Sequence, residues 1–132
     1  MSITVKWLEE RQFVGTDSTG HSVVLSSPRD GVGMKASELL LVSLAGCTAH
    51  DVVEILAKKR QNLESLTVEV QAEQEPDPPW AFRRIHTVYR LRGDLSDTAV
   101  RKAIELSETK YCSVAATLRG VAELTWEYAI EP

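Results

Sequence analysis

Apolar and polar side chains alternate in the first part of this chain and then give way to a helical pattern. Positions 3–7 alternate apolar with polar residues, which predicts a strand with one buried face. Residues 13–16 and 22–25 predict two further strands, and the turn formers at 17–20, Asp-Ser-Thr-Gly, predict a hairpin between them. Residues 26–33 contain one proline and two glycines, so we expect a loop there.

The next segment predicts one long helix. Residues 36–60 contain no proline and a single glycine, Gly46, and good helix formers dominate them. Nearly every side of the first half is apolar, because it contains Leu39, Leu40, Leu41, Val42, Leu44, Ala45 and Ala49. We therefore expect this helix to be covered all round. A chain of 132 residues can hardly do that alone, so we expect a second copy to lie over the helix and share its core.

The second half of the chain predicts a hairpin, two helices and a last strand. Residues 66–70 alternate in a strand with one wet face, and the proline-rich, acidic segment 73–79 ends it. In the following strand Ile85, Thr87, Tyr89 and Leu91 share one face.

Ser96 is a plausible N-cap for a helix that runs to about Thr109. A short helix over 113–118, stopped by Gly120, precedes a strand over 121–130. The order βββ-α-ββ-α-α-β has no regular βα alternation, so we expect one α+β domain over residues 1–132 with a mainly antiparallel sheet.

Composition and charge narrow the function classes. The chain is 43% apolar and 26% charged, the balance of an ordinary globular protein. A net charge of −4 does not favour binding to nucleic acid. The sequence also contains no basic amphipathic segment of the kind that binds a membrane surface. The N-terminus lacks the apolar stretch of a secretory signal, so we expect a cytoplasmic protein. Its two cysteines are too few for a disulfide scaffold, and a bond between them would be redox chemistry.

Cys47 lies mid-helix, where an apolar stripe turns polar. At about 100° per residue, the side chains that point within roughly 60° of its direction include those of His50, Asp51, Glu54 and Lys58. A thiol at this place can be partly buried and still be reached by a solute. The alternative is a buried cysteine that packs as a small apolar side chain.

Cys112 lies at the start of the short helix predicted over 113–118. Backbone N–H groups that lack intrahelical partners can stabilise a thiolate there. The two cysteines are distant along the sequence, so only the tertiary fold can bring them together.

Two segments around these cysteines resemble the OsmC/Ohr family of thiol-dependent hydroperoxide reductases. The segment SELLLVSLAGCTAHDV resembles the first-cysteine helix of that family, and KYCSVAATL resembles its second-cysteine segment. The order of elements is also similar over nearly the whole chain. The resemblance implies an intertwined homodimer, with sheets wrapped around long central helices and active sites at the subunit interface.

The resemblance also implies a reaction. In the family the first cysteine attacks a hydroperoxide as a thiolate and becomes a sulfenic acid, and the second cysteine converts this acid to a disulfide. Carried over, Cys47 is the peroxidatic thiol and Cys112 the resolving one. An external dithiol, of lipoyl type in the family, reduces the disulfide. No cofactor or metal is expected.

An arginine from the N-terminal strands favours the thiolate in the family, since a thiol of pKa about 8.5 is mostly protonated at neutral pH. Arg11 matches it best, by its spacing from Pro28, and Arg29 is the second choice. The alternative for Arg11 is a solvated charge beside Glu9 and Glu10.

One position departs from the family pattern. The organic-hydroperoxide branch has a Pro-Glu pair whose glutamate lies ten positions before the first cysteine, where this chain has Ala36 and Ser37. Glu38 does not replace it, because on a continuous helix it points away from Cys47. This departure leaves two alternatives open, a protein that binds a small ligand and a redox sensor, both without efficient peroxidase turnover.

His50 forms a Cys-x-x-His pair with Cys47, which can present two ligands to a metal. A tetrahedral site needs four, and the sequence contains no second such pair. We therefore expect His50 to be a polar residue at the edge of the site.

Overall fold

The computed structural model describes residues 1–29 and 31–132. Its contacts divide the chain into two compact units, Met1–Leu40 and Leu41–Pro132. Helix α1, Ala36–Lys58, crosses the boundary between them. The single domain expected from the sequence stays a prediction, and each unit is described by itself below.

The first unit is an antiparallel sheet of the predicted three strands. Their order in the sheet is that of the sequence, β1 (Thr4–Glu9), β2 (Gln12–Thr16) and β3 (Ser22–Ser26). The predicted hairpin between β2 and β3 is confirmed. Asp17 closes it, because its carboxylate accepts hydrogen bonds of 2.9 Å from the backbone N–H groups of Thr19 and His21.

Strand β1 differs from the sequence expectation. Its alternation predicted one buried face, but all six residues of the strand are exposed, and Trp7 is 63% exposed. A period of two identifies the apolar face of a strand and does not say what covers it. In the single chain that face is uncovered.

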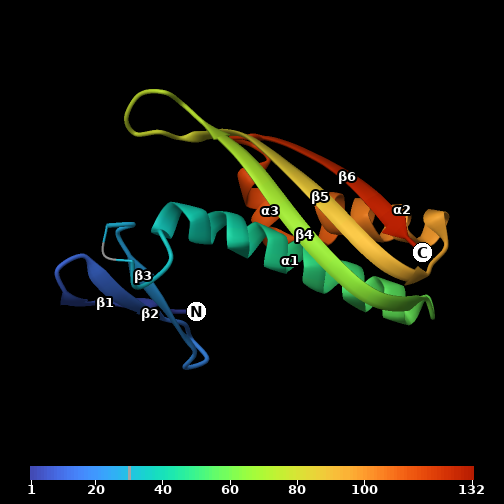
Figure 1. Ribbon diagram of the computed structural model, residues 1–132, viewed down its shortest axis with the longest axis horizontal. Coiled ribbons are helices and arrows are strands. Elements are labelled where there is room, and N and C mark those ends of the chain that lie inside the picture. Colours follow the sequence, from blue (N-terminus) through green and yellow to red (C-terminus); the bar gives the residue numbers. More distant parts are fainter. Residues whose placement is uncertain (30) are drawn as a thin grey trace. The chain divides into compact units, whose positions relative to one another are not determined.

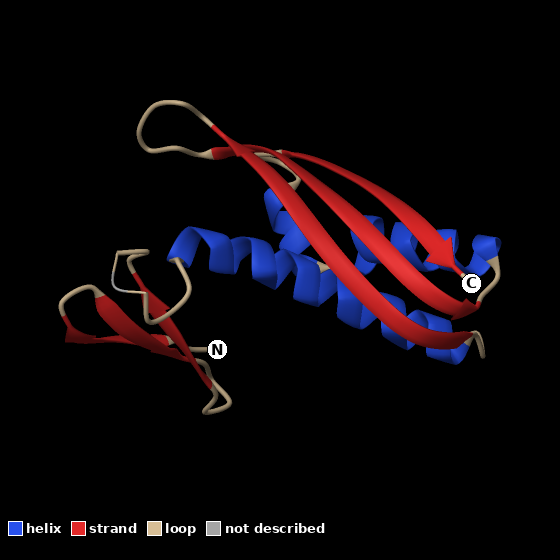
Figure 2. Ribbon diagram, in the orientation of Figure 1, coloured by secondary structure: helices blue, strands red, loops and turns tan. Residues whose placement is uncertain are grey.

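The second unit is a three-stranded sheet with helices on one face (Figure 1). The strands lie in the order β4 (Asn62–Gln74), β5 (Phe82–Asp94) and β6 (Glu123–Glu131). The hairpin of β4 and β5 is antiparallel as predicted, whereas β6 is parallel to β5. A parallel pair needs a crossover, and here it consists of α2 (Asp97–Leu106), η1 (Ser107–Tyr111) and α3 (Ser113–Leu118). Figure 2 shows these helices on the same side of the sheet as α1.

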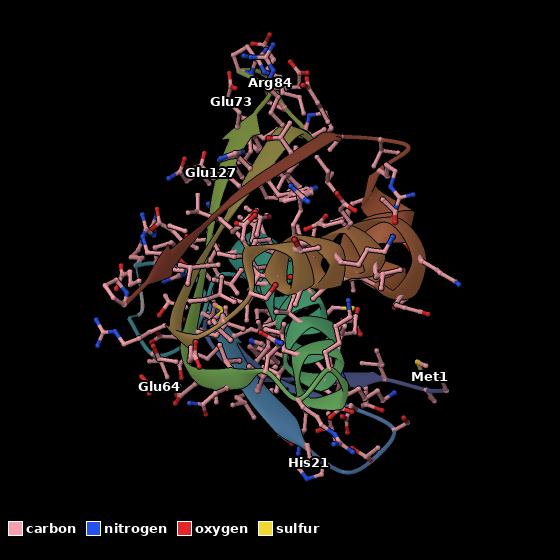
Figure 3. The ribbon with its side chains drawn as sticks, turned by 90° about the vertical axis from the view of Figure 1, so that its right-hand side faces the viewer. Met1, His21, Glu64, Glu73, Arg84 and Glu127 are labelled. Atoms are coloured by element: carbon pink, nitrogen blue, oxygen red, sulfur yellow. The ribbon has the colours of Figure 1, made fainter. Side chains whose placement is uncertain are left out.

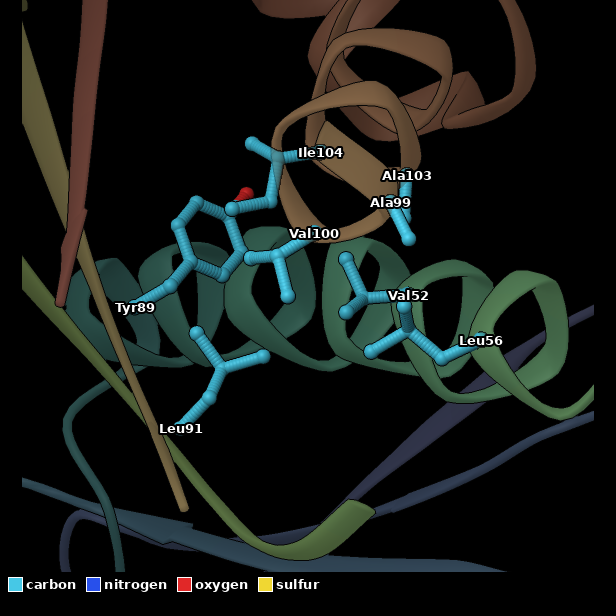
Figure 4. Packing of buried hydrophobic residues seen from close by; sticks show 8 residues of the cluster. All are labelled: Val52, Leu56, Tyr89, Leu91, Ala99, Val100, Ala103 and Ile104. Atoms are coloured by element: carbon cyan, nitrogen blue, oxygen red, sulfur yellow. The ribbon is translucent and has the colours of Figure 1, made fainter. Parts of the chain in front are cut away.

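Helix and strand periodicities place the core between these helices and the sheet. On α1 the buried residues are Leu44, Thr48, Val52 and Leu56, four apart and therefore on one face. On β5 the predicted face is buried, and it consists of Ile85, Thr87, Tyr89 and Leu91. Figure 4 shows the main cluster, in which α1 and α2 meet β5. Each fully buried Val, Leu or Ile side chain contributes about 1.5–3 kcal/mol.

The single chain covers only one face of α1. The sequence predicted cover on all sides, but Val42 is 48% and Val53 44% exposed. By length and mean hydropathy α1 is also long and apolar enough to cross a membrane, with 22% of its most apolar window buried. The packing of one helix face against β5 and α2 is the pattern of a core helix.

The crossover departs from the predicted helix boundaries. Ser96 caps α2 as expected, because its side chain accepts a hydrogen bond from the backbone N–H of Ala99. The helix predicted to reach Thr109 ends at Leu106 and widens into the π-helix η1. The backbone N–H of Cys112 donates to the Ser107 carbonyl over 2.9 Å, across five residues instead of four. Propensity alone does not reveal this wider turn.

The outer face of the second sheet is polar. Figure 3 shows Glu73 and Arg84 close together near one end of the sheet, with Glu127 farther along. The ion pairs of this face join neighbouring strands and include Arg83 with Glu73, Arg90 with Glu69, and Arg92 with Glu131. Exposed pairs of this kind contribute little stability, because water and dissolved ions screen the charges.

Gly93 is required where β5 turns toward α2. Its φ is +139°, and a Cβ atom there would overlap the carbonyl oxygen of Asn62 in β4. We expect Gly93→Ala to lower the free energy of unfolding by on the order of 2 kcal/mol. Urea denaturation followed by circular dichroism measures it. The control is Gly120→Ala, since a Cβ at Gly120 meets nothing within 4 Å. Equal stability of the Gly93 variant and the wild type would contradict this interpretation.

Candidate functional site

Cys47 lies on α1, at the border between its buried and exposed faces. Its side chain is half-buried and packs against a second core cluster, which contains Leu44, Ile85, Cys112, Ala115, Leu118 and Ala122. The predicted partly buried thiol is therefore present in the structure. The alternative, a cysteine that packs as a small apolar side chain, stays open, because Cys47 also packs against this cluster.

Cys112 is the N-cap of α3 and is only 2% exposed. The backbone N–H of Ala115 donates a hydrogen bond of 3.3 Å to its sulfur atom. The helix start therefore lies where the sequence placed it, with an amide directed at the thiol.

The fold brings the two cysteines together. The sulfur atoms of Cys47 and Cys112 and a carboxylate oxygen of Asp51 all lie within 4.8 Å of one another. Both cysteines are free thiols in this state. A disulfide needs an S–S distance of about 2.05 Å, so the two sulfur atoms must move closer together before one forms.

Burial changes the proton affinity of Cys112. Its pKa is raised chiefly because burial disfavours the charged thiolate, and the hydrogen bond with Cys47 raises it further. The amides of Ala115 and Val114 oppose this shift and are outweighed. The amides at the helix start favour the thiolate as the sequence analysis expected, but burial has the larger effect on the pKa of Cys112. Cys112 is a protonated thiol at neutral pH.

Asp51 is held beside the two thiols. The hydroxyl of Ser107, in η1, donates a hydrogen bond of 2.9 Å to its Oδ2. On its other side, Nδ1 of His50 lies 3.9 Å from Oδ1 of Asp51. The His50 side chain is 75% exposed, as expected for a residue at the edge of the site, whereas that of Asp51 is 20% exposed.

A hollow of about 660 Å³ lies next to this group. It is lined by the polar stripe that the sequence placed beside Cys47 and by the end of the crossover, namely His50, Asp51, Glu54, Ile55, Lys58, Lys59, Leu106 and Tyr111. Asp51 belongs both to the lining and to the sulfur cluster. Asp51 therefore joins the hollow to the thiol pair, while neither cysteine is among the described residues that line the hollow.

Tyr89 and Glu108 form a buried pair of a phenol and a carboxyl group near Cys112. The hydroxyl of Tyr89 donates to the carboxyl group of Glu108, and an Arg119 guanidinium N–H donates to the Glu108 backbone carbonyl over 2.5 Å. Burial raises the pKa of both Tyr89 and Glu108. The sequence did not reveal this pair, because Glu108 falls inside the helix that was predicted to run to about Thr109. The sequence signal that could have identified this pair is a glutamate four positions before Cys112.

The arginines named from the sequence belong to the first unit. Arg11 lies in the turn between β1 and β2 with an exposed side chain, and its carbonyl accepts a hydrogen bond of 3.2 Å from the Ser27 N–H. Arg29 is exposed too, and its backbone N–H donates to the Ser27 hydroxyl. Ser37 lies in the first turn of α1. The roles of both arginines stay predictions.

Comparison with known proteins identifies the family. The profile described as OsmC-like protein matches residues 29–127, about three quarters of the chain. The chain belongs to the OsmC family. It is 34% identical over 131 residues to the protein YhfA of Escherichia coli K12, and 98% of each chain is covered.

Solved structures of OsmC-family proteins show the same fold. The OsmC-like protein of Mycoplasma pneumoniae matches with a TM-score of 0.86 at 17% identity, over 99% of this chain and 96% of that one. The organic hydroperoxide resistance protein OhrB of Bacillus subtilis matches with a TM-score of 0.64 at 16% identity, over 97% and 96%. The α+β fold with two three-stranded sheets and a long helix is therefore that of the family.

The raised pKa of Glu108 predicts how stability varies with pH. The folded protein holds this proton more tightly than the unfolded chain does, so the contribution is complete below the ordinary pKa of 4.5 and is lost as pH rises through the raised value. We expect Glu108→Gln to remove this loss, because the amide stays neutral and can still accept from Tyr89. Urea denaturation from pH 4 upward measures it.

The matched control is Glu64→Gln, which removes an exposed carboxyl group. An unchanged slope of stability against pH in Glu108→Gln would count against a neutral, buried Glu108.

Proposed function

We propose that this protein is a thiol peroxidase that reduces hydroperoxides in oxidative stress defence. The Cys47 thiolate attacks the distal peroxide oxygen, so the O–O bond breaks, Cys47 becomes a sulfenic acid, and an alcohol, or water from hydrogen peroxide, leaves. The Cys112 thiol then attacks the Cys47 sulfur, and water leaves as the disulfide forms. The observation that carries the proposal is the approach of both sulfur atoms and the Asp51 carboxylate to within 4.8 Å.

The environments of the two thiols support this order of events. Cys47 is half-buried beside a hollow, whereas Cys112 is buried and its pKa is raised. The attacking thiol must meet a solute, and the resolving thiol need meet only the sulfenic acid. Family membership supports the same chemistry, since a related solved structure is named an organic hydroperoxide resistance protein.

The remaining parts of the site are proposals from the family resemblance. Arg11 stabilises the Cys47 thiolate, with Arg29 as the second choice. A homodimer completes the two active sites at its subunit interface. An external dithiol of lipoyl type reduces the disulfide in the cytoplasm.

A second copy is supported by uncovered apolar surface. Exposed large apolar side chains occur on β1, where they include Val5 and Trp7, and on α1, where they include Val42 and Val53. Exposed apolar side chains that gather on one strand or one helix mark interaction sites in soluble proteins. A second copy of the chain is the partner whose own apolar strand and helix match these surfaces.

A protein that binds a small ligand in the same pocket is the second candidate, favoured by Ser37, and a redox sensor is the third. This serine stands where the organic-hydroperoxide branch has its glutamate. A sensor forms the same disulfide but is oxidised once per chain without sustained turnover. The kinetics below separate these functions.

Peroxide turnover tests the proposed function. With cumene hydroperoxide and excess dithiothreitol, we expect many turnovers for the wild type and a loss of at least about 100-fold for Cys47→Ser, which lacks the nucleophile. Cys112→Ser is the matched variant. Without dithiothreitol it still consumes one peroxide per chain and accumulates a sulfenic acid that dimedone traps. Equal rates for the wild type and Cys47→Ser would refute the proposal, and a single turnover of the wild type would favour the sensor.

The oligomeric state in solution tests whether two copies of the chain form the proposed dimer. We expect a dimer by light scattering, and we expect Val42→Glu combined with Val53→Glu to yield monomers, since two buried carboxylates at an apolar interface are costly. The control is Lys102→Glu, which adds a carboxylate on the exposed face of α2. A monomeric wild type would contradict the proposed dimer.

A further inference from the structure

The fold assembles three metal-ligating side chains that the sequence separates. Spacing along α1 suggested only Cys47 and His50 as a pair of ligands. In the structure Cys112 arrives from the crossover and Asp51 lies one helical turn beyond Cys47. The two sulfur atoms and the carboxylate oxygen lie within 4.8 Å of one another. The objection that one pair of ligands is too few therefore no longer applies.

We propose that the reduced protein binds one Zn²⁺ ion through the thiolates of Cys47 and Cys112 and the carboxylate of Asp51. Zinc combines sulfur and oxygen ligands in tetrahedral sites, with Zn–S distances of about 2.3 Å and Zn–O distances of about 2.0–2.2 Å. Ligand atoms around such an ion lie about 3.3–3.8 Å apart. The observed cluster reaches this spacing with side-chain movements of about an ångström.

Neighbouring groups hold two of the three ligands in place. The Ser107 hydroxyl donates to Oδ2 of Asp51, and the Ala115 N–H donates to the sulfur of Cys112. Hydrogen bonds from such second-layer groups orient the ligands of metal sites. Three protein ligands leave the fourth position to water, which reaches Asp51 from the hollow beside α1. The site therefore has the ligand number of an exchangeable zinc centre.

Metal binding and disulfide formation exclude each other. Zinc displaces the two thiol protons and keeps its own oxidation state. Oxidation of the pair transfers two electrons to the hydroperoxide, joins the sulfur atoms and releases the ion. This coupling rests on the proposed peroxidase, whereas binding of zinc by the reduced protein does not. Zinc also occupies the lone pair with which Cys47 would attack, so the bound ion suppresses peroxide reduction.

Cobalt titration of the reduced full-length protein tests the site without any peroxide. We expect one Co²⁺ per chain, with sulfur-to-cobalt charge-transfer absorption in the near ultraviolet and the strong visible bands of tetrahedral cobalt, both abolished by added Zn²⁺. Cys47→Ser and Cys112→Ser each lose at least about 100-fold in affinity. Ser107→Ala loses about 10–100-fold, because Asp51 is no longer held.

Comparison of Asp51→Asn with Glu54→Gln tests whether the Asp51 carboxylate is a ligand of the metal. Both retain the thiols, and Glu54 is an exposed carboxylate on the same helix that also lines the hollow. We expect Asp51→Asn to weaken cobalt binding by at least about 10-fold and Glu54→Gln to leave it unchanged. Circular dichroism verifies that each variant is folded.

Three results would overturn the site. They are absence of the charge-transfer absorption, a wild-type cobalt affinity in a variant that combines Cys47→Ser with Cys112→Ser, and a wild-type cobalt affinity of the disulfide form. These outcomes are independent of peroxide turnover, so the failure of one proposal is distinguishable from that of the other.

Discussion

The packing of one face of α1 against β5 and the crossover is the interaction on which the site depends. Leu44 and Val52 are buried on that face, and Cys47 and Asp51 lie between them at spacings of three and four residues. A crossover must join β5 to β6, because these strands are parallel, and it lies on the same side of the sheet as α1 (Figure 2). Its widened turn η1 and the start of α3 then bring Ser107 and Cys112 to α1. Core packing, rather than local sequence, sets the distance between the sulfur atoms.

Buried polar groups give this region its chemical character. Burial raises the pKa of Cys112 and of Glu108, which both lie in the crossover. Ser107 connects the crossover to Asp51 through a hydrogen bond, and Tyr89 connects β5 to Glu108. Each of these contacts joins the crossover to the rest of the unit. The site and the fold are therefore stabilised by the same side chains.

Much of the fold follows from the sequence. The hairpins at Asp17–Gly20 and between β4 and β5, the α1 helix and the Ser96 cap were predicted, because turn formers, periodicity and capping act locally. The wide turn at η1 was not predicted, since a π-helix depends on tertiary packing and not on propensity. Strand β1 shows the same limit, because its alternation identified an apolar face but could not show whether the chain covers that face. For the site, motifs identified Cys47 and Cys112, whereas the contacts of Ser107, Tyr89 and Glu108 depend on the crossover and have no local signature.

The identity of the bond formed on oxidation tests the central claim most directly. Reduced protein, mixed with a ¹⁵N-labelled copy, is treated with one equivalent of hydroperoxide and analysed by mass spectrometry before and after proteolysis. The account predicts that each chain loses two hydrogen atoms and that the peptides of Cys47 and Cys112 are linked with a single isotopic label. Linked peptides of mixed label, or two cysteines oxidised separately without a link, would contradict it.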